Sequence, residues 1–82
     1  MDDFEVMLIK VDQRVQKVGE VQTLLTKYGC NIKTRLGMHE AGDACSNQGL
    51  IFLQLTGGED ELKEFEKSLN EVKGVKAKLT GI

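Results

Sequence analysis

The stretch that decides the fold is residues 31–56, NIKTRLGMHEAGDACSNQGLIFLQLT. Its two arms, residues 31–38 and 49–56, are rich in β-branched and large apolar residues, and the segment between them is small and polar. Apolar runs bounded by Gly, Asn, Asp and Ser are typical of strands joined by a turn. The stretch therefore predicts a β-hairpin with a polar tip.

The second arm of this hairpin carries apolar side chains on both of its faces. Alternate positions place Ile51, Leu53 and Leu55 on one face and Leu50 and Phe52 on the other. A strand with one face in water alternates apolar and polar residues, so we expect this strand to be covered on both sides. We expect one cover to be the protein's own helices and the other to be a second copy of the chain.

Residues 4–11 predict another strand of the same kind. Its two faces are both apolar, and they consist of Phe4, Val6 and Leu8, and of Met7, Ile9 and Val11. Such a pattern indicates a strand in the middle of a sheet.

A first amphipathic helix is predicted between these two strands. Apolar residues recur at steps of three and four, the period of one helix face. They are Val15, Val18, Val21, Leu25 and Tyr28. Asp12 is placed to cap the start of the helix, and Gly29 is placed to end it in the left-handed conformation. Gly19 falls in mid-helix, where we interpret it as a surface glycine, with a close crossing as the alternative.

A second amphipathic helix is predicted to begin at residues 59–61, whose carboxylates suit the positive end of a helix dipole. Its apolar stripe consists of Leu62, Phe65, Leu69 and Val72. Gly74 is placed as the stop. Residues 75–80 then alternate apolar residues with Lys76, Lys78 and Thr80, which predicts an edge strand whose lysines discourage unwanted pairing.

These elements follow the order β-α-β-β-α-β. Two right-handed crossovers around a hairpin give a four-stranded antiparallel sheet with both helices on one face. The first and third strands are central in this topology, and they are the two that are apolar on both faces. The sequence therefore predicts an α+β fold, a ferredoxin-like sandwich that forms a single domain over residues 1–82.

The sheet face that the helices leave open is expected to be apolar, whichever parity faces outward. Monomers rarely expose a contiguous apolar patch of more than a few hundred Å², and a specific interface buries roughly 800 Å² on each partner. We therefore predict self-association, as a homodimer or tetramer, through the sheet face, the sheet edge or both.

Length and composition exclude several classes of protein. The chain has 82 residues, a net charge of −2 and dispersed Lys and Arg residues, so direct binding to nucleic acid is not expected. Its longest apolar runs have four residues, as at residues 50–53, and are far shorter than the roughly 18 residues of a membrane span. The acidic start and the two cysteines favour a cytoplasmic protein with free thiols.

His39 and Cys45 flank the hairpin tip, and we interpret them first as solvent-exposed residues without a ligand. The alternative is that they bind a transition metal, because both side chains do so well. A structural zinc site usually has four ligands, and one chain offers these two with Asp43 or Glu40. A symmetric oligomer would pool ligands across subunits. No other cofactor is indicated. Cys30 is expected to be a small hydrophobic residue of the core.

Short motifs along the chain point to a family. They are Arg35-Leu36-Gly37, GLIFLQL at residues 49–55, VKGVKAK at residues 72–78, Arg14 and Leu24-Leu25. Together they resemble the small family of iron-only hydrogenase system regulators over nearly the whole chain. The resemblance implies an ACT-like fold, related to the ligand-sensing domain of nickel-responsive repressors. It implies a regulatory role and brings no catalytic residues.

The resemblance also concerns ligands. His39 and Cys45 are spaced like two of the nickel ligands of the repressor domain, and Gly37 stands where a further ligand is needed. The glycine that ACT domains carry soon after the first strand is absent, because Asp12 is followed by Gln13-Arg14-Val15.

The leading hypothesis is a non-enzymatic regulatory module that senses a small-molecule effector at a subunit interface, or that mediates assembly. Its candidate ligand-binding residues are Arg35, Gly37, Met38 and Gly49. The alternative is a transition-metal sensor that uses His39 and Cys45 across subunits. An enzyme is the third class, and the sequence disfavours it because the open face carries apolar residues in place of a cluster of His, Arg or carboxylate groups.

Overall fold

The elements of the structure follow the order that the sequence predicts. The computed structural model describes residues 4–12, 19–39 and 48–82. Its strands are β1 (Glu5–Asp12), β2 (Ile32–His39), β3 (Gln48–Leu55) and β4 (Val75–Gly81). Its helices are α1 (Glu20–Lys27) and α2 (Glu59–Asn70), and a 3₁₀ turn, η1 (Gly29–Asn31), joins α1 to β2.

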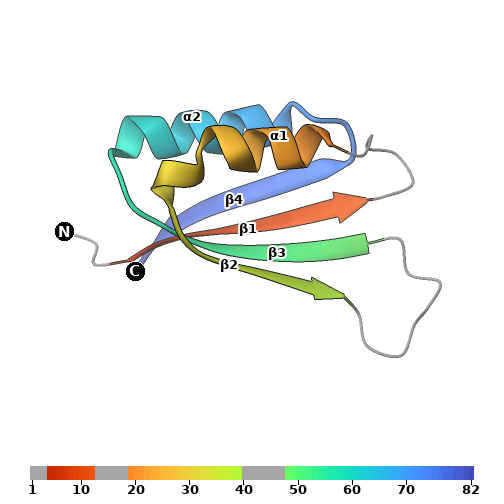
Figure 1. Cartoon of the computed structure of the whole chain (residues 1–82), viewed down its shortest axis with the longest axis horizontal. Coiled ribbons are helices and arrows are strands. Elements are labelled where there is room, and N and C mark those ends of the chain that lie inside the picture. The colour runs from red at the N-terminus through yellow and green to blue at the C-terminus, as the bar shows by residue number, and fades with distance from the viewer. Residues whose placement is uncertain (1–3, 13–18, 40–47) are drawn as a thin grey trace.

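The strands form an antiparallel sheet in the order β2-β3-β1-β4. Both helices lie side by side on the same side of this sheet (Figure 1). β1 and β3 are the central strands and β2 and β4 are the edges, as their apolar content predicts. The predicted ferredoxin-like sandwich is confirmed.

The hydrophobic core lies between the sheet and the helices. Odd-numbered positions of β1 and β3 face the helices, so Met7, Ile9 and Leu53 are fully buried. The helices bury the predicted stripes, with Leu62, Phe65 and Leu69 in α2 and Val21 and Leu25 in α1. Tyr28 stacks on Phe65 with ring centroids 4.4 Å apart, which joins the end of α1 to α2. Burying each large apolar side chain contributes about 1.5–3 kcal/mol. This energy holds the odd-numbered positions of β1 and β3 on the helical side of the sheet.

The start of α1 differs from the prediction. The helix begins at Glu20, and Gly19 is its N-cap residue with a φ of 106°, in the left-handed region. The Gly19 carbonyl accepts a hydrogen bond from the Thr23 amide at 2.8 Å. Because Gly19 is the N-cap residue, the predicted mid-helix position is wrong. A Cβ there would meet nothing within 4 Å among the described residues, which gives no support to a close crossing. Asp12, predicted to cap this helix, is instead the last residue of β1.

The end of α1 differs as well. Gly29 begins η1 and does not take the left-handed conformation, because the chain continues into a right-handed 3₁₀ turn. Cys30 is exposed rather than in the core, since η1 lies at the rim of the sandwich and buries none of its residues. Arg14, Val15 and Val18 lie outside the described residues.

Asn31 ties the base of the hairpin to α2. Its side-chain amide donates to the Thr56 carbonyl at 3.0 Å and to the Glu61 carboxylate at 2.9 Å. The Thr56 amide donates back to the Asn31 carbonyl at 2.8 Å. Gly57 has a φ of 126°, and a Cβ there would clash with the Asn31 side chain. The turn from β3 to α2 therefore requires glycine for its backbone conformation and for its space.

Side chains of α2 close the outer edge of β4. The Asn70 side chain accepts a hydrogen bond from the Ala77 amide at 2.8 Å and donates one to the Ala77 carbonyl at 3.0 Å. The Glu66 carboxylate accepts a hydrogen bond from the Leu79 amide at 2.6 Å. These backbone groups are the ones that an added strand would use, so α2 blocks strand addition at this edge.

Substitution of the glycines at the two ends of α1 tests where this helix begins and ends. Gly19→Ala should lower the free energy of unfolding by about 1 kcal/mol, because alanine is disfavoured in the left-handed region. Gly29→Ala should leave it unchanged or raise it by up to about 1 kcal/mol, because alanine restricts the unfolded chain and adds no strain here. Urea unfolding followed by circular dichroism measures both. The opposite pair of signs would contradict these boundaries.

Removal of the Asn70 side chain tests the closure of the β4 edge. Asn70→Ala should lower the free energy of unfolding by about 0.5–1.5 kcal/mol, because the exposed amide and carbonyl of Ala77 exchange their side-chain partner for water. It should also speed hydrogen exchange at the Ala77 amide. Glu64→Ala, at an exposed position of the same helix, is the matched control and should change stability by less than about 0.5 kcal/mol. Equal exchange rates in the two variants would rule out the hydrogen bond.

Candidate functional site

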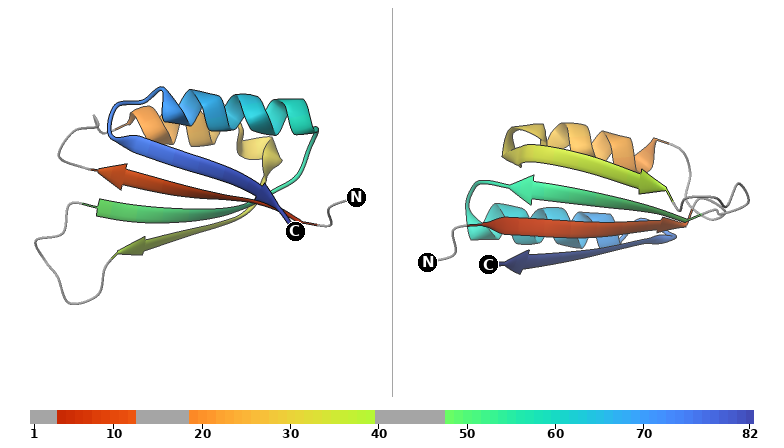
Figure 2. Two further views of the ribbon diagram at one scale, coloured as in Figure 1. Left: turned by 180° about the vertical axis from the view of Figure 1, so that it is seen from behind. Right: turned by 90° about the horizontal axis from the view of Figure 1, so that it is seen from below.

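The sheet face opposite the helices is open, and the strand register determines which residues lie on it. Leu8 of β1 lies between Phe52 of β3 and Lys78 of β4, and Leu36 of β2 lies beside Phe52. Viewed from below, the strands lie in front and both helices behind them, so no described element covers this face (Figure 2). The sequence allows either set of alternate residues of β1 to face away from the helices. The set that contains Phe4 is the one on the open face.

Large apolar side chains dominate the open face. The exposed fractions are 53% for Phe4, 42% for Leu8, 53% for Leu36, 36% for Leu50 and 74% for Ile82. All five occupy open-face positions, because Ile82 pairs with Phe4 beyond the end of β4. Soluble monomers seldom leave contiguous apolar surface of this kind in water. The open face is therefore the strongest candidate for a contact surface in the described part of the chain.

A shallow cavity of about 320 Å³ opens at one end of this face. It is lined by Phe4, Val6, Phe52, Gln54 and Ile82. Backbone hydrogen bonds of 2.8 and 3.2 Å between Phe4 and Ile82 hold its wall together. The polar group at its rim is the Gln54 side-chain oxygen, which accepts a hydrogen bond from the Thr34 hydroxyl at 3.4 Å. This lining suits an apolar group better than a charged one.

Positive charge on the open face is confined to one corner. Lys76 and Lys78 of β4 and Lys10 of β1 are neighbours in the register, and Asp12 ends β1 beside them. The corner diagonally across the sheet, around Thr34, is polar and uncharged. The apolar residues run between these two corners.

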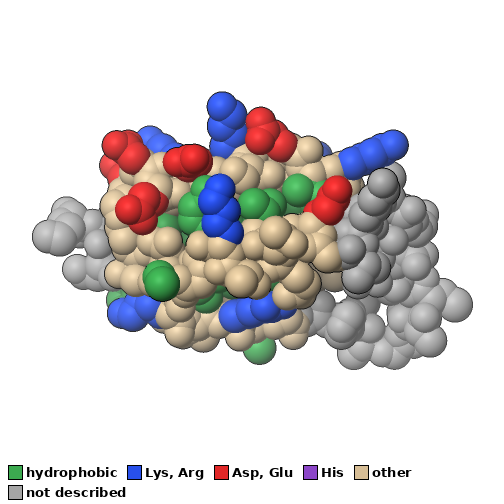
Figure 3. Space-filling model, turned by 45° about the horizontal axis from the view of Figure 1, so that its top comes forward, with side chains coloured by type: hydrophobic (Ala, Val, Ile, Leu, Met, Phe, Trp, Pro, Cys, Tyr) green, Lys and Arg blue, Asp and Glu red, His purple; other side chains and the backbone are tan. Residues whose placement is uncertain are grey.

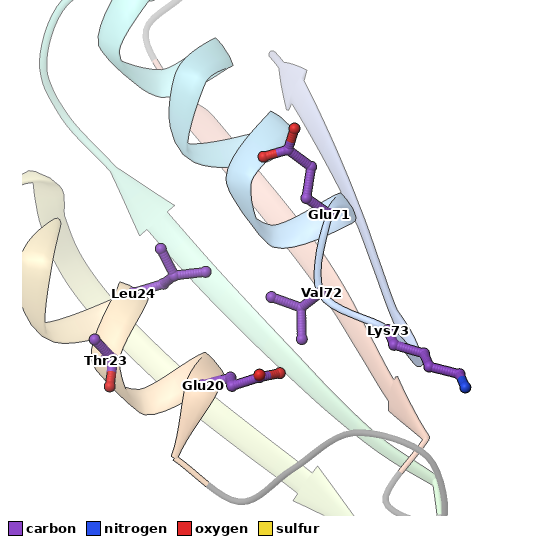
Figure 4. A pocket seen from close by; sticks show the side chains of 6 residues that line it. All are labelled: Glu20, Thr23, Leu24, Glu71, Val72 and Lys73. Carbon is purple, nitrogen blue, oxygen red and sulfur yellow. The ribbon is translucent and has the colours of Figure 1, made fainter.

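A second hollow lies on the helical side, between α1 and the segment that follows α2. It is a groove of about 540 Å³ lined by Glu20, Thr23, Leu24, Glu71, Val72 and Lys73. Leu24 and Val72 face each other across it, whereas Glu71 and Lys73 point away (Figure 4). Figure 3 shows a narrow band of hydrophobic surface between charged side chains on this side of the molecule. The groove is thus an incompletely filled seam between helices, and its charged groups do not converge.

The predicted ligand-binding residues lie on the two strands of the hairpin, β2 and β3. Arg35, Gly37 and Gly49 hold register positions on the helical side, and Met38 pairs with Leu50 of β3 in the register. The Arg35 guanidinium donates to the Gln22 side chain of α1 at 3.4 Å. Arg35, Gly37 and Gly49 line neither of the two hollows described above. Their role in ligand binding stays a prediction.

The predicted metal site is described in part. His39 is the last residue of β2, and Cys45, Glu40 and Asp43 lie outside the described residues. Within residues 4–12, 19–39 and 48–82, no three His, Cys, Asp or Glu side chains are grouped so that they could hold a metal ion. Metal binding by His39 and Cys45 stays the alternative hypothesis.

The helices add two observations. The Glu59 carboxylate, 3.1 Å from the Lys63 ammonium, raises the pKa of Lys63 on the exposed side of α2, away from the open face. Neither α1 nor α2, the helices of the described residues, has the length and apolar character that crossing a membrane requires.

Sequence reasoning missed three residues of the open face. Ile82 could have been found, because the parity of Lys76, Lys78 and Thr80 continues to it. Thr34 and Gln54 could not be paired, because the register between β2 and β3 shifts between Ile32 and Thr34. An irregularity of that kind leaves no signal in an apolar pattern.

Comparison with known proteins gives structural relatives alone, since no protein-family model and no curated sequence matches this chain. The uncharacterized protein TM1266 from Thermotoga maritima is 24% identical, with a TM-score of 0.84 over 100% of this chain and 99% of that one. A dimeric ferredoxin-like protein of unknown function from Thermobifida fusca is 14% identical, with a TM-score of 0.46 over 96% of this chain and 92% of that one. An amidase of the hydantoinase/carbamoylase family from Burkholderia phymatum is 13% identical, with a TM-score of 0.43 over 96% of this chain and 27% of that one. The chain shares its fold with TM1266, and at this level of identity the likeness extends to the fold alone.

Proposed function

We propose that this chain is a non-enzymatic, ACT-like regulatory module that works in the cytoplasm as a homo-oligomer, with the open face of the sheet as its subunit interface. The observation that carries the proposal is the set of large apolar side chains exposed on that face, among them Phe4, Leu8 and Leu36. Covering such a surface is favourable by about 25 cal/mol per Å² of apolar area removed from water.

A second copy of the chain is the partner that this surface favours. The face is apolar along its centre and polar at two corners, which is the usual arrangement of an interface core and rim. Asn70 and Glu66 occupy the outer edge of β4, so contact through the face is preferred to contact through that edge. Each copy carries the same face, so two copies related by a two-fold axis cover each other's open face and form a closed dimer that needs no other protein.

The regulatory part of the proposal is supported by the resemblance to the iron-only hydrogenase system regulators. The chemistry of the described surface supports it too, because catalysis needs an acid, a base or a nucleophile positioned in a cavity. The cavity on the open face and the groove between the helices are both largely apolar. A module of this kind acts by assembly, or by binding an effector near the hairpin residues Arg35, Gly37, Met38 and Gly49, and through it on an iron-only hydrogenase system.

Leu8→Lys tests the interface. Leu8 lies in the middle of the open face and is 42% exposed, so the variant should remain folded. Its dimer dissociation constant should rise about 100-fold or more, because each of two symmetry-related leucines is replaced by a charge that must stay in water. Sedimentation equilibrium measures the constant, and circular dichroism confirms the fold.

Thr26→Lys is the matched control, because it adds the same charge at an exposed position of α1 on the other side of the molecule. It should leave the dissociation constant unchanged. A parent protein that sediments as a monomer at micromolar concentration, or equal weakening by both variants, would contradict the proposed interface.

Effector binding is tested by a thermal-shift screen of amino acids and small anionic metabolites. A compound that binds the folded protein raises the melting temperature by mass action, and Arg35→Ala should abolish that rise. Lys33→Ala removes a neighbouring exposed cation from the same strand and should preserve it. A screen in which no compound shifts the melting temperature would count against sensing and leave assembly as the function.

A further inference from the structure

Lys10, Lys76 and Lys78 form one corner of the open face, which we call the lysine corner. This corner makes the face asymmetric, so that different orientations of a second copy on it are no longer equivalent. We propose that two copies pack face to face about a two-fold axis that runs along the apolar diagonal, from Phe4 and Ile82 at one end to Leu50 at the other. The lysine corner of each copy then covers the Thr34 corner of its partner. This inference rests on the self-association proposed above and specifies its geometry.

The register arranges the open face as a grid whose columns are β2, β3, β1 and β4. Its rows are Thr34, Gln54, Val6 and Thr80, then Leu36, Phe52, Leu8 and Lys78, then Met38, Leu50, Lys10 and Lys76. Phe4 and Ile82 add a row beside Val6 and Thr80. Apolar residues follow one diagonal of this grid, and the two remaining corners hold the lysines and the Thr34–Gln54 pair.

Two-fold symmetry restricts how such a face meets its copy. The axis must lie in the plane of contact, because it exchanges a sheet above that plane with one below it. Each residue therefore lies over the residue at its mirror-image position across the axis. Strands lie about 4.8 Å apart, and alternate residues of a strand about 6.8 Å apart, which fixes these positions on the grid.

An axis along the apolar diagonal places most lysines over polar groups or water. The exception is Lys10, which falls on the partner's edge strand β2 between Leu36 and Met38, where its ammonium group can extend past that edge into water. The same axis places Lys78 over the partner's Thr34 and Phe4 over the partner's Ile82. Leu8 falls over the gap between the partner's Phe52 and Gln54. Lys76 falls beyond the outer edge of the partner's β2, where its ammonium group stays in water. The cavity beside Phe4 is covered by the partner's apolar end.

Other directions of the axis conflict with the lysines. An axis along the opposite diagonal places the lysine corner of one copy over the lysine corner of its partner, where like charges repel. An axis parallel to the strands lays Lys78 on Leu36, and an axis across the strands lays Lys10 on Phe4. Both would remove an ammonium group from water without giving it a partner. The apolar diagonal brings one lysine, Lys10, over apolar positions of the partner, whereas the axis across the strands brings two lysines and the axis parallel to the strands brings all three.

A lipid surface is the other class of occupant for a face that combines apolar residues with lysines. The open face fits a second copy better, because its positive charge is confined to Lys10, Lys76 and Lys78 at one corner. Anionic headgroups attract positive charge all around an inserted apolar centre. The corner around Thr34 carries no such charge and mirrors the lysine corner across the apolar diagonal.

A charge placed at Thr34 tests the axis. Thr34→Glu should tighten the dimer about 2- to 30-fold at low salt, because the new carboxylate faces the partner's Lys78 on both sides of the axis. The gain should fade at high salt. Thr34→Lys should weaken the dimer by a similar factor, and Thr34→Glu combined with Lys78→Glu should lose the gain. Thr26→Glu, with the same charge change on α1, should have no effect. Sedimentation equilibrium measures each dissociation constant.

The outcomes separate this inference from the proposed function. A parent dimer that Thr34→Glu weakens would overturn the axis, because the Thr34 corners would then face each other, while the proposed interface would stand. A monomeric parent would overturn both. A monomeric parent that binds vesicles containing phosphatidylserine, with binding lost in Leu8→Lys, would assign the open face to lipid and overturn both as well.

Discussion

Burial of Met7, Ile9 and Leu53 beneath the two helices is the constraint on which the rest of the structure depends. Side chains of a strand alternate between the two faces of the sheet, so a shift of one residue would exchange the faces of the whole strand. With these three side chains in the core, the even-numbered positions of β1 and β3 are directed to the open side. Packing of the core does not require those positions to be apolar, and Leu8 and Phe52 are apolar nonetheless. Their character is the observation on which the proposed contact with a second copy rests.

α2 limits where that contact can lie. Its buried residues Leu62, Phe65 and Leu69 hold it against the sheet, and this fixes the distance at which Asn70 and Glu66 reach β4. One helix thus completes the core and closes an edge of the sheet. In the proposed dimer, contacts between copies are thereby directed away from the edge formed by β4.

The sequence predicted the strands to within about one residue and their order in the sheet, because apolar residues on both faces distinguish central strands from edges. It failed at the ends of α1, because a helical period that runs through Gly19 indicates continuity and cannot show that this glycine takes a positive φ. The sequence left open which of two sets of alternate residues lies on the open face. Packing of the core against the helices decides between them. The lysine corner could not be predicted, because it depends on the register of Lys10 with Lys76, and register is a property of paired strands.

Apolar area and charge have separate roles on the open face. The hydrophobic effect is not directional, so side chains such as Leu8 and Leu36 favour contact between copies without selecting one orientation. A lysine that is forced against an apolar surface loses hydration, whereas one that lies over a hydroxyl or reaches water keeps it. Three lysines at one corner therefore disfavour most orientations while they leave the apolar contact intact. In the proposed dimer, the lysine corner would give specificity, because it disfavours other orientations of the two copies. The apolar residues along the diagonal would give the affinity.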